Sequence, residues 1–519
     1  MGNTEKQSLT DLRRRITESL RIQRDSSEAV PYIDTSNVVG DVSARQNHAI
    51  FARRGCGKTL LLHYSSRSLD EKIKTVYLNC EDFKRHSFPN VLIEILDALF
   101  QELEKHLTGW FGKKKQSRDL IKQIRNDLQD LRSNADSTEQ AVRATTATEL
   151  GQSGRAEAAI RKGPFSAKLA SGDVSKTTNE VERSFKFRSD KLKQLDMLLP
   201  RLKEQVREFF SVSNSVTAVF LQIDDFYHLR KADQPFVMDY IHRLCKDVPL
   251  YFKLATLRHA SSLYVDREGQ PIGAQERHDY QPINIDYTFA DFARTREQNR
   301  RIFYEFGKLA NMQPREIDDL FKGEGFDRLV MAGGGVPRDT LSLFLEVLGD
   351  VQSKGGDRIG KDEVRVLSRS NFERRIEELK QDSEGGDQDV LMRGIYVLRA
   401  FCLEKKSNTF VIAEKTLQQN DEFRDLINRL LDYRIIHSAG TAITHKSQPG
   451  TYQAFAIDIG CYAHLRKLHG RFTELDLSER DAKEKLRSAP VFDRDLYESL
   501  SRTAPSNVES ALLQEDAAD

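Results

Sequence analysis

The sequence predicts an α/β fold: a mostly parallel sheet with helices on both faces, followed by a helical lid and a C-terminal winged-helix-like domain. Three observations predict it. Short apolar segments alternate with amphipathic helical segments, a glycine-containing loop joins the first such pair, and a later stretch contains only helices before a hairpin pattern. Strands that alternate with helices are typical of a parallel sheet covered on both faces.

Length and composition indicate a multidomain protein that buries a core. At about 150 residues per domain, 519 residues correspond to about three domains. The apolar share of 39% and the charged share of 31% are ordinary for a globular chain. The net charge of +1 excludes a bulk basic field, so any nucleic-acid contact must come from a local patch.

The five cysteines are scattered and form no C-x-x-C pair, which argues against a disulfide framework or a structural zinc site. The N-terminus lacks the apolar region of a signal peptide, and no apolar stretch approaches the ~20 residues that span a bilayer. Lys6 occupies the position where a myristoylation signal requires Ser or Thr. We therefore expect a reduced, cytoplasmic protein without a membrane contact.

The first part of the chain is predicted to alternate between helices and strands. Residues 1–29 form an N-terminal amphipathic helix, with apolar positions at helical spacing. These positions are Leu9, Leu12, Ile16 and Leu20. Five apolar segments are predicted to be strands: 48–51, 74–78, 216–223, 251–256 and 283–285. Helices are predicted at 58–69 and 90–107.

Residues 113–210 interrupt this alternation and are predicted to be an insertion. Charged helical patterns at 113–133 and 181–210 flank a segment, 134–180, that is rich in Ala, Ser, Thr and Gly. Such a segment buries too little apolar surface to offset its ordering entropy, so we expect it to be disordered or loose. The insertion is either a solvated spacer or a helical hairpin that contacts a partner protein.

Residues 52–59, Ala-Arg-Arg-Gly-Cys-Gly-Lys-Thr, fit the phosphate-loop pattern G-x-x-x-x-G-K-[ST], except that Ala52 replaces the first glycine. Glycines let successive backbone N–H groups point at phosphate oxygens, Lys58 neutralises phosphate charge, and the Thr59 hydroxyl reaches magnesium. The helix that begins at Lys58 adds its positive end. The loop predicts binding of ATP and Mg²⁺. The predicted cofactor-binding residues are Arg54, Gly55, Cys56, Gly57, Lys58, Thr59 and Leu60.

An acidic pair ends the third predicted strand. In Phe-Leu-Gln-Ile-Asp-Asp, Asp224 is predicted to hold magnesium with Thr59, and Asp225 to act as the base that polarises the attacking water. Asp is one methylene shorter than Glu, so we expect slow hydrolysis. Residues 30–287 are therefore predicted to be a P-loop ATPase domain.

The remaining chain is divided into four predicted parts: a helical lid at 288–352, a linker at 353–390, a winged-helix-like domain at 391–470 and a C-terminal tail at 471–519, whose end should be frayed. In the winged-helix-like domain, helices at 391–405 and 421–433 precede a hairpin. This arrangement is typical of DNA-binding modules. The second helix carries four acids, which have the wrong sign for phosphates, so contact with a protein is the open alternative.

The order of these motifs resembles the AAA+ P-loop ATPases of the origin-recognition and cell-division-control initiator clade, and is similar to the related STAND signalling ATPases. The resemblance covers roughly residues 30–112 and 211–470. The sequence departs from the family at Ala52, at Asp225, where many members carry Glu, and in the long insertion.

The resemblance implies further site residues. Thr256 and Arg258 occupy the sensor position after the fourth strand, and Arg338, in Gly-Gly-Gly-Val-Pro-Arg, would reach from the lid to the phosphates as the second sensor. It also implies that Tyr32 and Val39 pack the adenine, and that Arg267 or Arg277 is the available candidate for the arginine finger of a homo-oligomer.

These motifs are compatible with three functions. The leading interpretation is an ATP-driven switch that assembles on DNA or on a partner protein. The alternatives are a STAND-like signalling NTPase that oligomerises on sensing a ligand, and a nucleotide-held scaffold with little turnover.

Overall fold

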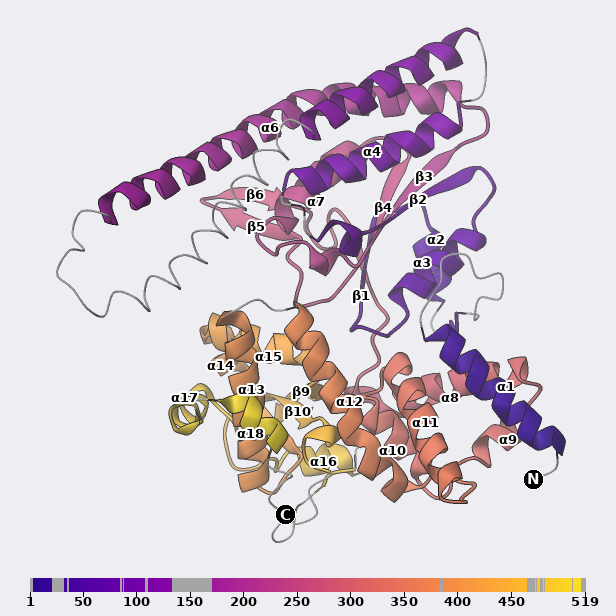
Figure 1. The fold of residues 1–519 in the computed structure, drawn as a ribbon, viewed down its shortest axis with the longest axis vertical. Coiled ribbons are helices and arrows are strands. Elements are labelled where there is room, and N and C mark those ends of the chain that lie inside the picture. The colour runs from indigo at the N-terminus through magenta and orange to yellow at the C-terminus, as the bar shows by residue number, and fades with distance from the viewer. Residues whose placement is uncertain are drawn as a thin grey trace.

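The computed structural model describes residues 3–20, 32–34, 37–84, 86, 88–107, 111–132, 170–382, 386–463, 472, 474–476, 479, 481–505 and 507–514. Figure 1 shows an α/β unit with a long helical arm above a mainly helical unit, and the first and last described helices lie in the lower unit.

The central sheet has five strands that are all parallel, in the order β2-β3-β4-β1-β7. They are β1 (His48–Phe51), β2 (Ile73–Asn79), β3 (Ala218–Asp224), β4 (Leu250–Thr256) and β7 (Gln281–Asn284). The predicted parallel sheet is confirmed. Because the strands are parallel, their carboxyl ends meet at one edge, and β4 separates the strand before the phosphate loop from the strand that ends in Asp224.

Helices cover both faces of this sheet. The residues of β1 alternate: Ile50 packs in one cluster with Leu61 and Leu62, whereas Ala49 and Phe51 belong to the larger cluster on the other face. The smaller cluster includes α2 (Val38–Ser43) and α3 (Lys58–Arg67), and the larger one includes α4 (Asn90–Lys105) and α7 (Gln234–Cys245). Side chains of successive strand residues point to opposite faces, which accounts for the split.

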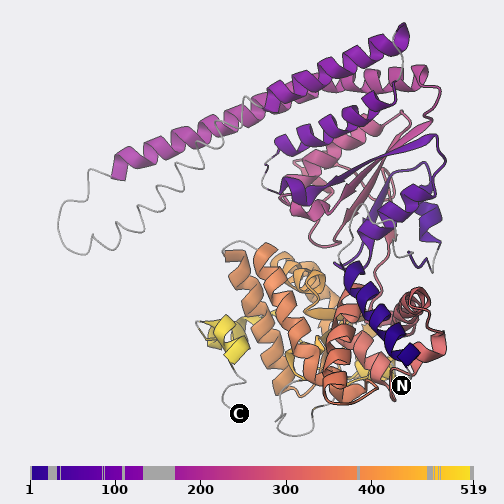
Figure 2. The same cartoon turned by 45° about the vertical axis from the view of Figure 1, so that its right-hand side comes forward.

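The predicted insertion forms the arm, which extends away from the sheet in both views (Figures 1 and 2). It contains helical residues 113–132 and α6 (Ala170–Val212). Its base is not a solvated spacer, because Ile121, Leu128, Leu195 and Leu202 are buried in the core cluster that contains α4. Of the segment predicted to be loose, 134–169 lies outside the described residues, whereas residues 170–180 belong to α6.

A two-stranded hairpin that the sequence patterns did not predict lies between β4 and β7. It consists of β5 (Tyr264–Arg267) and β6 (Gln270–Gly273). The structure also contains four short 3-10 helices: η1 (Cys80–Phe83), η2 (Phe226–His228), η3 (Phe289–Asp291) and η4 (Ile459–Cys461). The last of these lies in the C-terminal unit, by which we mean the described residues from 386 to 514.

The lower unit begins with the helices of the predicted lid. They are α8 (Phe292–Leu309), α9 (Pro314–Asp318), α10 (Gly325–Ala332) and α11 (Pro337–Ser353). The N-terminal helix α1 (Asn3–Ser19) packs against α8 and α11 and buries Leu9, Leu12 and Ile16, as its spacing predicts.

The predicted linker at 353–390 is wrong for most of its length. It contains α12 (Lys361–Asp382) and the start of α13 (Gly386–Glu404). Phe372 and Ile376 of α12 are buried in the same core as the lid. Two charged residues of α12, Arg375 and Glu378, pair with Asp339 and Arg434 of neighbouring elements.

The winged-helix-like region contains α13, α14 (Glu414–Gln419), α15 (Asp421–Asp432) and a three-stranded antiparallel sheet in the order β8-β10-β9. The strands are β8 (Thr409–Ala413), β9 (Ile436–Thr444) and β10 (Thr451–Ile457). The hairpin of β9 and β10 was predicted from the sequence, whereas β8 was not.

The predicted tail at 471–519 is largely packed. It contains α16 (Ala482–Leu486), α17 (Arg494–Thr503) and α18 (Val508–Gln514), and residues 515–519 lie outside the described residues. Phe492 is fully buried against Phe401 and Phe410. In the part of the chain that the structure describes, no helix is both long and apolar enough to cross a bilayer.

Candidate nucleotide site

The phosphate loop joins β1 to α3 at the carboxyl edge of the sheet. Gly55 and Gly57 have φ angles of 82° and 88°, which is the left-handed region that side chains other than glycine rarely adopt. Helix α3 begins at Lys58, so its N-terminus opens toward the loop. The local arrangement of strand, loop and helix therefore agrees with the sequence prediction.

Lys58 points back into the loop. Its buried Nζ donates hydrogen bonds to the carbonyl oxygens of Ala52, at 2.9 Å, and Arg53, at 3.2 Å. Burial lowers the pKa of Lys58, and the nearby charges of Asp225 and Asp224 oppose this effect. The ammonium group thus lies between the loop backbone and the acidic pair.

Asp224 lies at the carboxyl end of β3, beside Thr59 at the start of α3. Its carboxylate accepts hydrogen bonds from the Tyr77 hydroxyl of β2 at 2.9 Å and from the Asp225 backbone N–H at 2.8 Å. Burial and the charge of Asp225 raise the pKa of Asp224, whereas the Thr59 and Tyr77 side chains and the charge of Lys58 lower it. Tyr77 was missed by sequence reasoning, although its strand had been located.

Asp225 begins the turn after β3, with a left-handed φ of 50°. Among the neighbouring charges that favour the protonated form of Lys58, the charge of Asp225 has the largest effect. The structure therefore brings together Lys58, Thr59, Asp224 and Asp225, which come from two strand ends separated by β4.

The two residues of the first sensor position have different surroundings. Thr256 is buried, its carbonyl oxygen accepts a hydrogen bond from the Ala52 N–H at 3.3 Å, and its hydroxyl contacts Ser261. Arg258 forms an ion pair with Glu276 at 2.8 Å and stacks over Phe51, 4.4 Å from the ring centroid. Thr256 therefore lies against the phosphate loop, whereas Arg258 is engaged with Glu276.

Arg258 and Glu276 line a cavity of about 570 Å³ beside the β5–β6 hairpin. Neither Asp224 nor Asp225 belongs to its lining.

Arg338 lies over the phosphate loop at the start of α11. Its backbone N–H donates to the Gly55 carbonyl at 3.3 Å, and its guanidinium is 3.9 Å from Glu378 of α12. A Cβ at position 55 would lie 2.8 Å from Val336 and 2.9 Å from Arg338, so only glycine fits there. The lid therefore touches the loop at the residue expected from the sequence.

The other predicted cofactor-binding residues line the same loop. The Arg54 guanidinium stacks over Tyr227 at 4.8 Å, and the Cys56 thiol lies 3.5 Å from Asp286, where burial raises its pKa. Leu60 is half-buried on α3.

Of the residues expected near adenine, Tyr32 has a ring carbon 3.7 Å from the position of a Cβ on Gly57, and Val39 packs in the cluster that contains α3. Of the finger candidates, Arg267 stacks over Phe236 at 5.4 Å, and Arg277 lies in the turn before β7 with φ 69°.

Arg53 is the most connected residue of the loop, and the sequence motifs assigned it no role. It is buried and donates to Asp286 at 2.8 Å, to the Gly334 carbonyl at 3.0 Å and to the Tyr287 carbonyl at 2.8 Å. It also lies 3.2 Å from Nδ1 of His437. Burial alone would raise the pKa of Asp286, but the charge and hydrogen bonds of Arg53 lower it.

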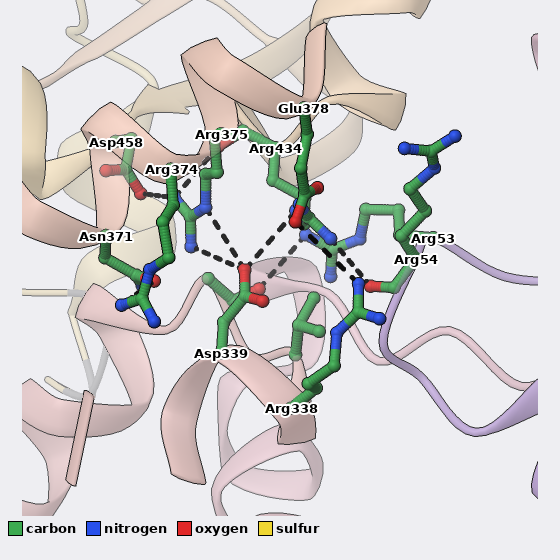
Figure 3. Close-up of polar contacts among 12 residues, drawn as sticks. Arg53, Arg54, Arg338, Asp339, Asn371, Arg374, Arg375, Glu378, Arg434 and Asp458 are labelled. Atoms are coloured by element: carbon green, nitrogen blue, oxygen red, sulfur yellow. Dashed lines mark hydrogen bonds and ion pairs between the residues drawn. The ribbon is translucent and has the colours of Figure 1, made fainter. Parts of the chain in front are cut away.

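Around Arg53 and Arg54, charged residues of the lid, α12 and the C-terminal unit converge (Figure 3). Asp339 lies 3.1 Å from Arg375 and 3.3 Å from Arg434, while Arg434 also contacts Glu378. The Arg434 guanidinium donates to the Arg54 carbonyl at 2.9 Å. Of these elements, the sequence predicted only the first turn of α11 to lie near the phosphate loop.

No protein-family model matches this chain, and no curated protein matches it. Among solved structures, it is similar to the ORC2 protein of Aeropyrum pernix in ADPNP–ADP complexes, with 10% identity, a TM-score of 0.36, and coverage of 92% of this chain and 97% of that chain. For A. pernix ORC1 in complex with DNA, identity is 12%, the TM-score 0.33, and coverage 89% and 94%. For Drosophila ORC bound to DNA, the values are 11%, 0.34, 87% and 91%.

Proposed function

We propose that this chain binds Mg²⁺–ATP in the phosphate loop, hydrolyses it slowly, and acts as an ATP-driven switch of the AAA+ type, related to the initiator clade. The position of the Thr59 side chain beside Asp224 supports this proposal most directly. It places a hydroxyl from the phosphate-loop helix and a carboxylate from a non-adjacent strand at one point, beside the Lys58 ammonium.

Thr59 and Asp224 would hold the magnesium ion. Mg²⁺ prefers oxygen ligands and usually keeps several waters, binding through one or two carboxylates and substrate phosphates. When bound, the ion would neutralise charge on the phosphate oxygens.

The other residues have separate roles in this proposal. Lys58 and the loop N–H groups bind phosphate, Asp225 orients the attacking water, and Thr256 and Arg338 report on the terminal phosphate. Arg258 would join them only after leaving Glu276.

Two substitutions test the site. Lys58→Ala should abolish nucleotide binding, because the only ammonium group in the loop is lost. Asp225→Ala should leave binding intact and lower turnover by at least about 100-fold, the range that a positioned base contributes. Binding is measured by titration with a fluorescent ATP analogue, and turnover by phosphate release. The exposed Lys354→Ala is the charge-matched control for Lys58→Ala. Unchanged turnover in Asp225→Ala would remove Asp225 from the mechanism.

The output of the switch is assembly on DNA or a partner protein, including other copies of this chain. A STAND-like signalling NTPase is the second candidate function, and the contact of Arg434 with the phosphate loop favours it, since it connects the C-terminal unit to the nucleotide site.

Measurements of ATP turnover, of assembly and of co-purified nucleotide separate these functions. Stimulation of ATP turnover by duplex DNA, with a steep loss on adding salt, would support DNA as the partner. ATP-dependent assembly without an effect of DNA would support the signalling function. Co-purified nucleotide without turnover would support a scaffold.

A further inference from the structure

The corner between α15 and β9 of the C-terminal unit lies over the same sheet edge as the phosphate loop. The Asp432 carboxylate accepts hydrogen bonds from the backbone N–H groups of His259, at 3.2 Å, and Ala260, at 2.8 Å. Two residues later, the Arg434 guanidinium donates to the Arg54 carbonyl at 2.9 Å. One corner therefore holds the loop after β4 and the phosphate loop at once.

These contacts are built from buried groups. Asp432 is 4% exposed and Arg434 is 1% exposed. Arg434 is itself fixed by Asp339 and Glu378, so its fork reaches the phosphate loop in one orientation (Figure 3). A buried charge such as the Arg434 guanidinium keeps its position because leaving it unpaired is costly.

A third contact, at the surface, completes the docking. Lys231, which follows the turn after β3, donates to Asp425 of α15 at 2.9 Å. The C-terminal unit thus touches the loops that follow β1, β3 and β4, the three strands whose ends carry the proposed nucleotide site.

The docking also accounts for two of the four acids on α15. Asp425 and Asp432 face the α/β unit, and Asp421 pairs with Arg424 on its own helix at 2.7 Å. The helix that would enter a DNA groove in a winged-helix protein is here turned toward the nucleotide site.

We propose that Asp432 and Arg434 are positioning residues of the nucleotide site, through which the docked C-terminal unit preorganises the phosphate loop and the loop after β4 for ATP. The inference rests on the proposed function. A loop that is already ordered loses less entropy when ligand binds, so docking strengthens binding. Coupling of this kind is reciprocal, so ATP in turn strengthens docking.

The surface pair Lys231–Asp425 allows a test that leaves the core and the site intact. K231D and D425K each place like charges at the contact, and the double variant K231D/D425K restores an opposite-charge pair in reverse. Exposed pairs of this kind change an equilibrium by up to about fivefold. Lys354→Asp, which breaks an exposed pair at the end of α11, is the matched control.

Docking is measured without nucleotide, as amide hydrogen exchange over residues 257–262 and 52–57. Each single variant should exchange faster there than the wild type, and the double variant and the control should not. ATP affinity is then measured with a fluorescent analogue, and should weaken by up to about fivefold in the single variants and recover in the double variant. A second variant, Asp432→Asn, should weaken ATP affinity and speed amide hydrogen exchange in the same two segments. The rate of turnover per bound ATP should change less than the ATP affinity does.

Tighter ATP binding in the single variants would overturn the inference, because the contact would then be inhibitory. Unchanged exchange, or unchanged affinity despite faster exchange, would also overturn it. If the wild type binds no ATP, the proposed function fails, and the exchange measurement alone then reports whether the corner orders these loops.

Discussion

At the scale of single residues, a chain of buried groups connects the phosphate loop to the C-terminal unit. A guanidinium group can only donate, so the His437 Nδ1 that faces Arg53 at 3.2 Å must be the acceptor. The proton of the ring is therefore on Nε2, which donates to Asp458 at 2.9 Å. His437 is neutral in this arrangement, and Asp458 in turn contacts Arg375.

This neutrality predicts a loss of stability in acid. Burial lowers the pKa of His437 from 6.5 to about 4; Asp458 opposes the shift, and Arg375 and Arg53 add to it. Between these pH values the unfolded state binds a proton that the folded state does not, so the free energy of unfolding falls as pH decreases. From pH 7 to pH 5, the wild type should lose about 2 kcal/mol more than His437→Gln in urea unfolding.

The comparison with His437→Gln isolates this residue. His48 and His259 also have lowered pKa values, about 3 and about 4, but they are present in both proteins and their effects cancel. Equal losses in the two proteins would show that His437 does not resist protonation.

At the scale of elements, α12 shows that a helix rich in charged residues can be buried, although its sequence does not predict burial. Its sequence has few apolar residues, yet Phe372, Ile376 and Leu379 pack in the core. Its charged residues Arg375 and Glu378 contact Asp339 and Arg434, so their charges are satisfied inside the protein. A helix whose polar residues have fixed partners does not need the wide apolar stripe of a surface helix.

Two residues of α12 make this testable. Ile376 is 2% exposed and Val366 is 57% exposed. Ile376→Ala should lower the free energy of unfolding by about 2–5 kcal/mol, because it leaves a cavity, whereas Val366→Ala should change it by less than about 0.5 kcal/mol. Chemical denaturation measures both. A near-zero effect at both positions would restore the interpretation of this segment as a linker.

At the scale of the whole molecule, residues 490–492 join the C-terminal part of the chain to β8. The Val411 N–H of β8 donates to the Pro490 carbonyl at 2.9 Å, and the Phe492 N–H returns a bond to the Val411 carbonyl at 2.9 Å. Phe492 also contacts Phe423 of α15. Phe492 therefore supports the helix that contacts the α/β unit through Asp425 and Asp432.

Truncation tests this arrangement. A chain that ends at residue 480 should lose several kcal/mol of stability, since removal of one buried Phe side chain alone costs about 3–5 kcal/mol. A chain that ends at residue 514 should unfold with the wild-type midpoint. Thermal unfolding compares the two. Equal midpoints for both truncations and the wild type would show that residues 481–514 do not contribute to the core.

The sequence alone determined the parallel sheet, the phosphate loop and the acidic pair. Strand periodicity, the left-handed glycines and the helix start at Lys58 are set by neighbouring residues, so they can be recognised without the fold. That Asp224 lies beside Thr59 also followed, because parallel strands bring their carboxyl ends to one edge.

Only the tertiary structure decided the contacts of Arg53, Arg434 and Asp432, and the burial of α12 and of Phe492. His437, which faces Arg53, and Arg54, which accepts from Arg434, lie 384 and 380 positions from those residues in the chain, and no local pattern specifies such pairs. When only its neighbours in the sequence are considered, a charged residue is interpreted as solvent-exposed. Its burial becomes favourable only when distant elements supply the opposite charges and backbone acceptors that replace water.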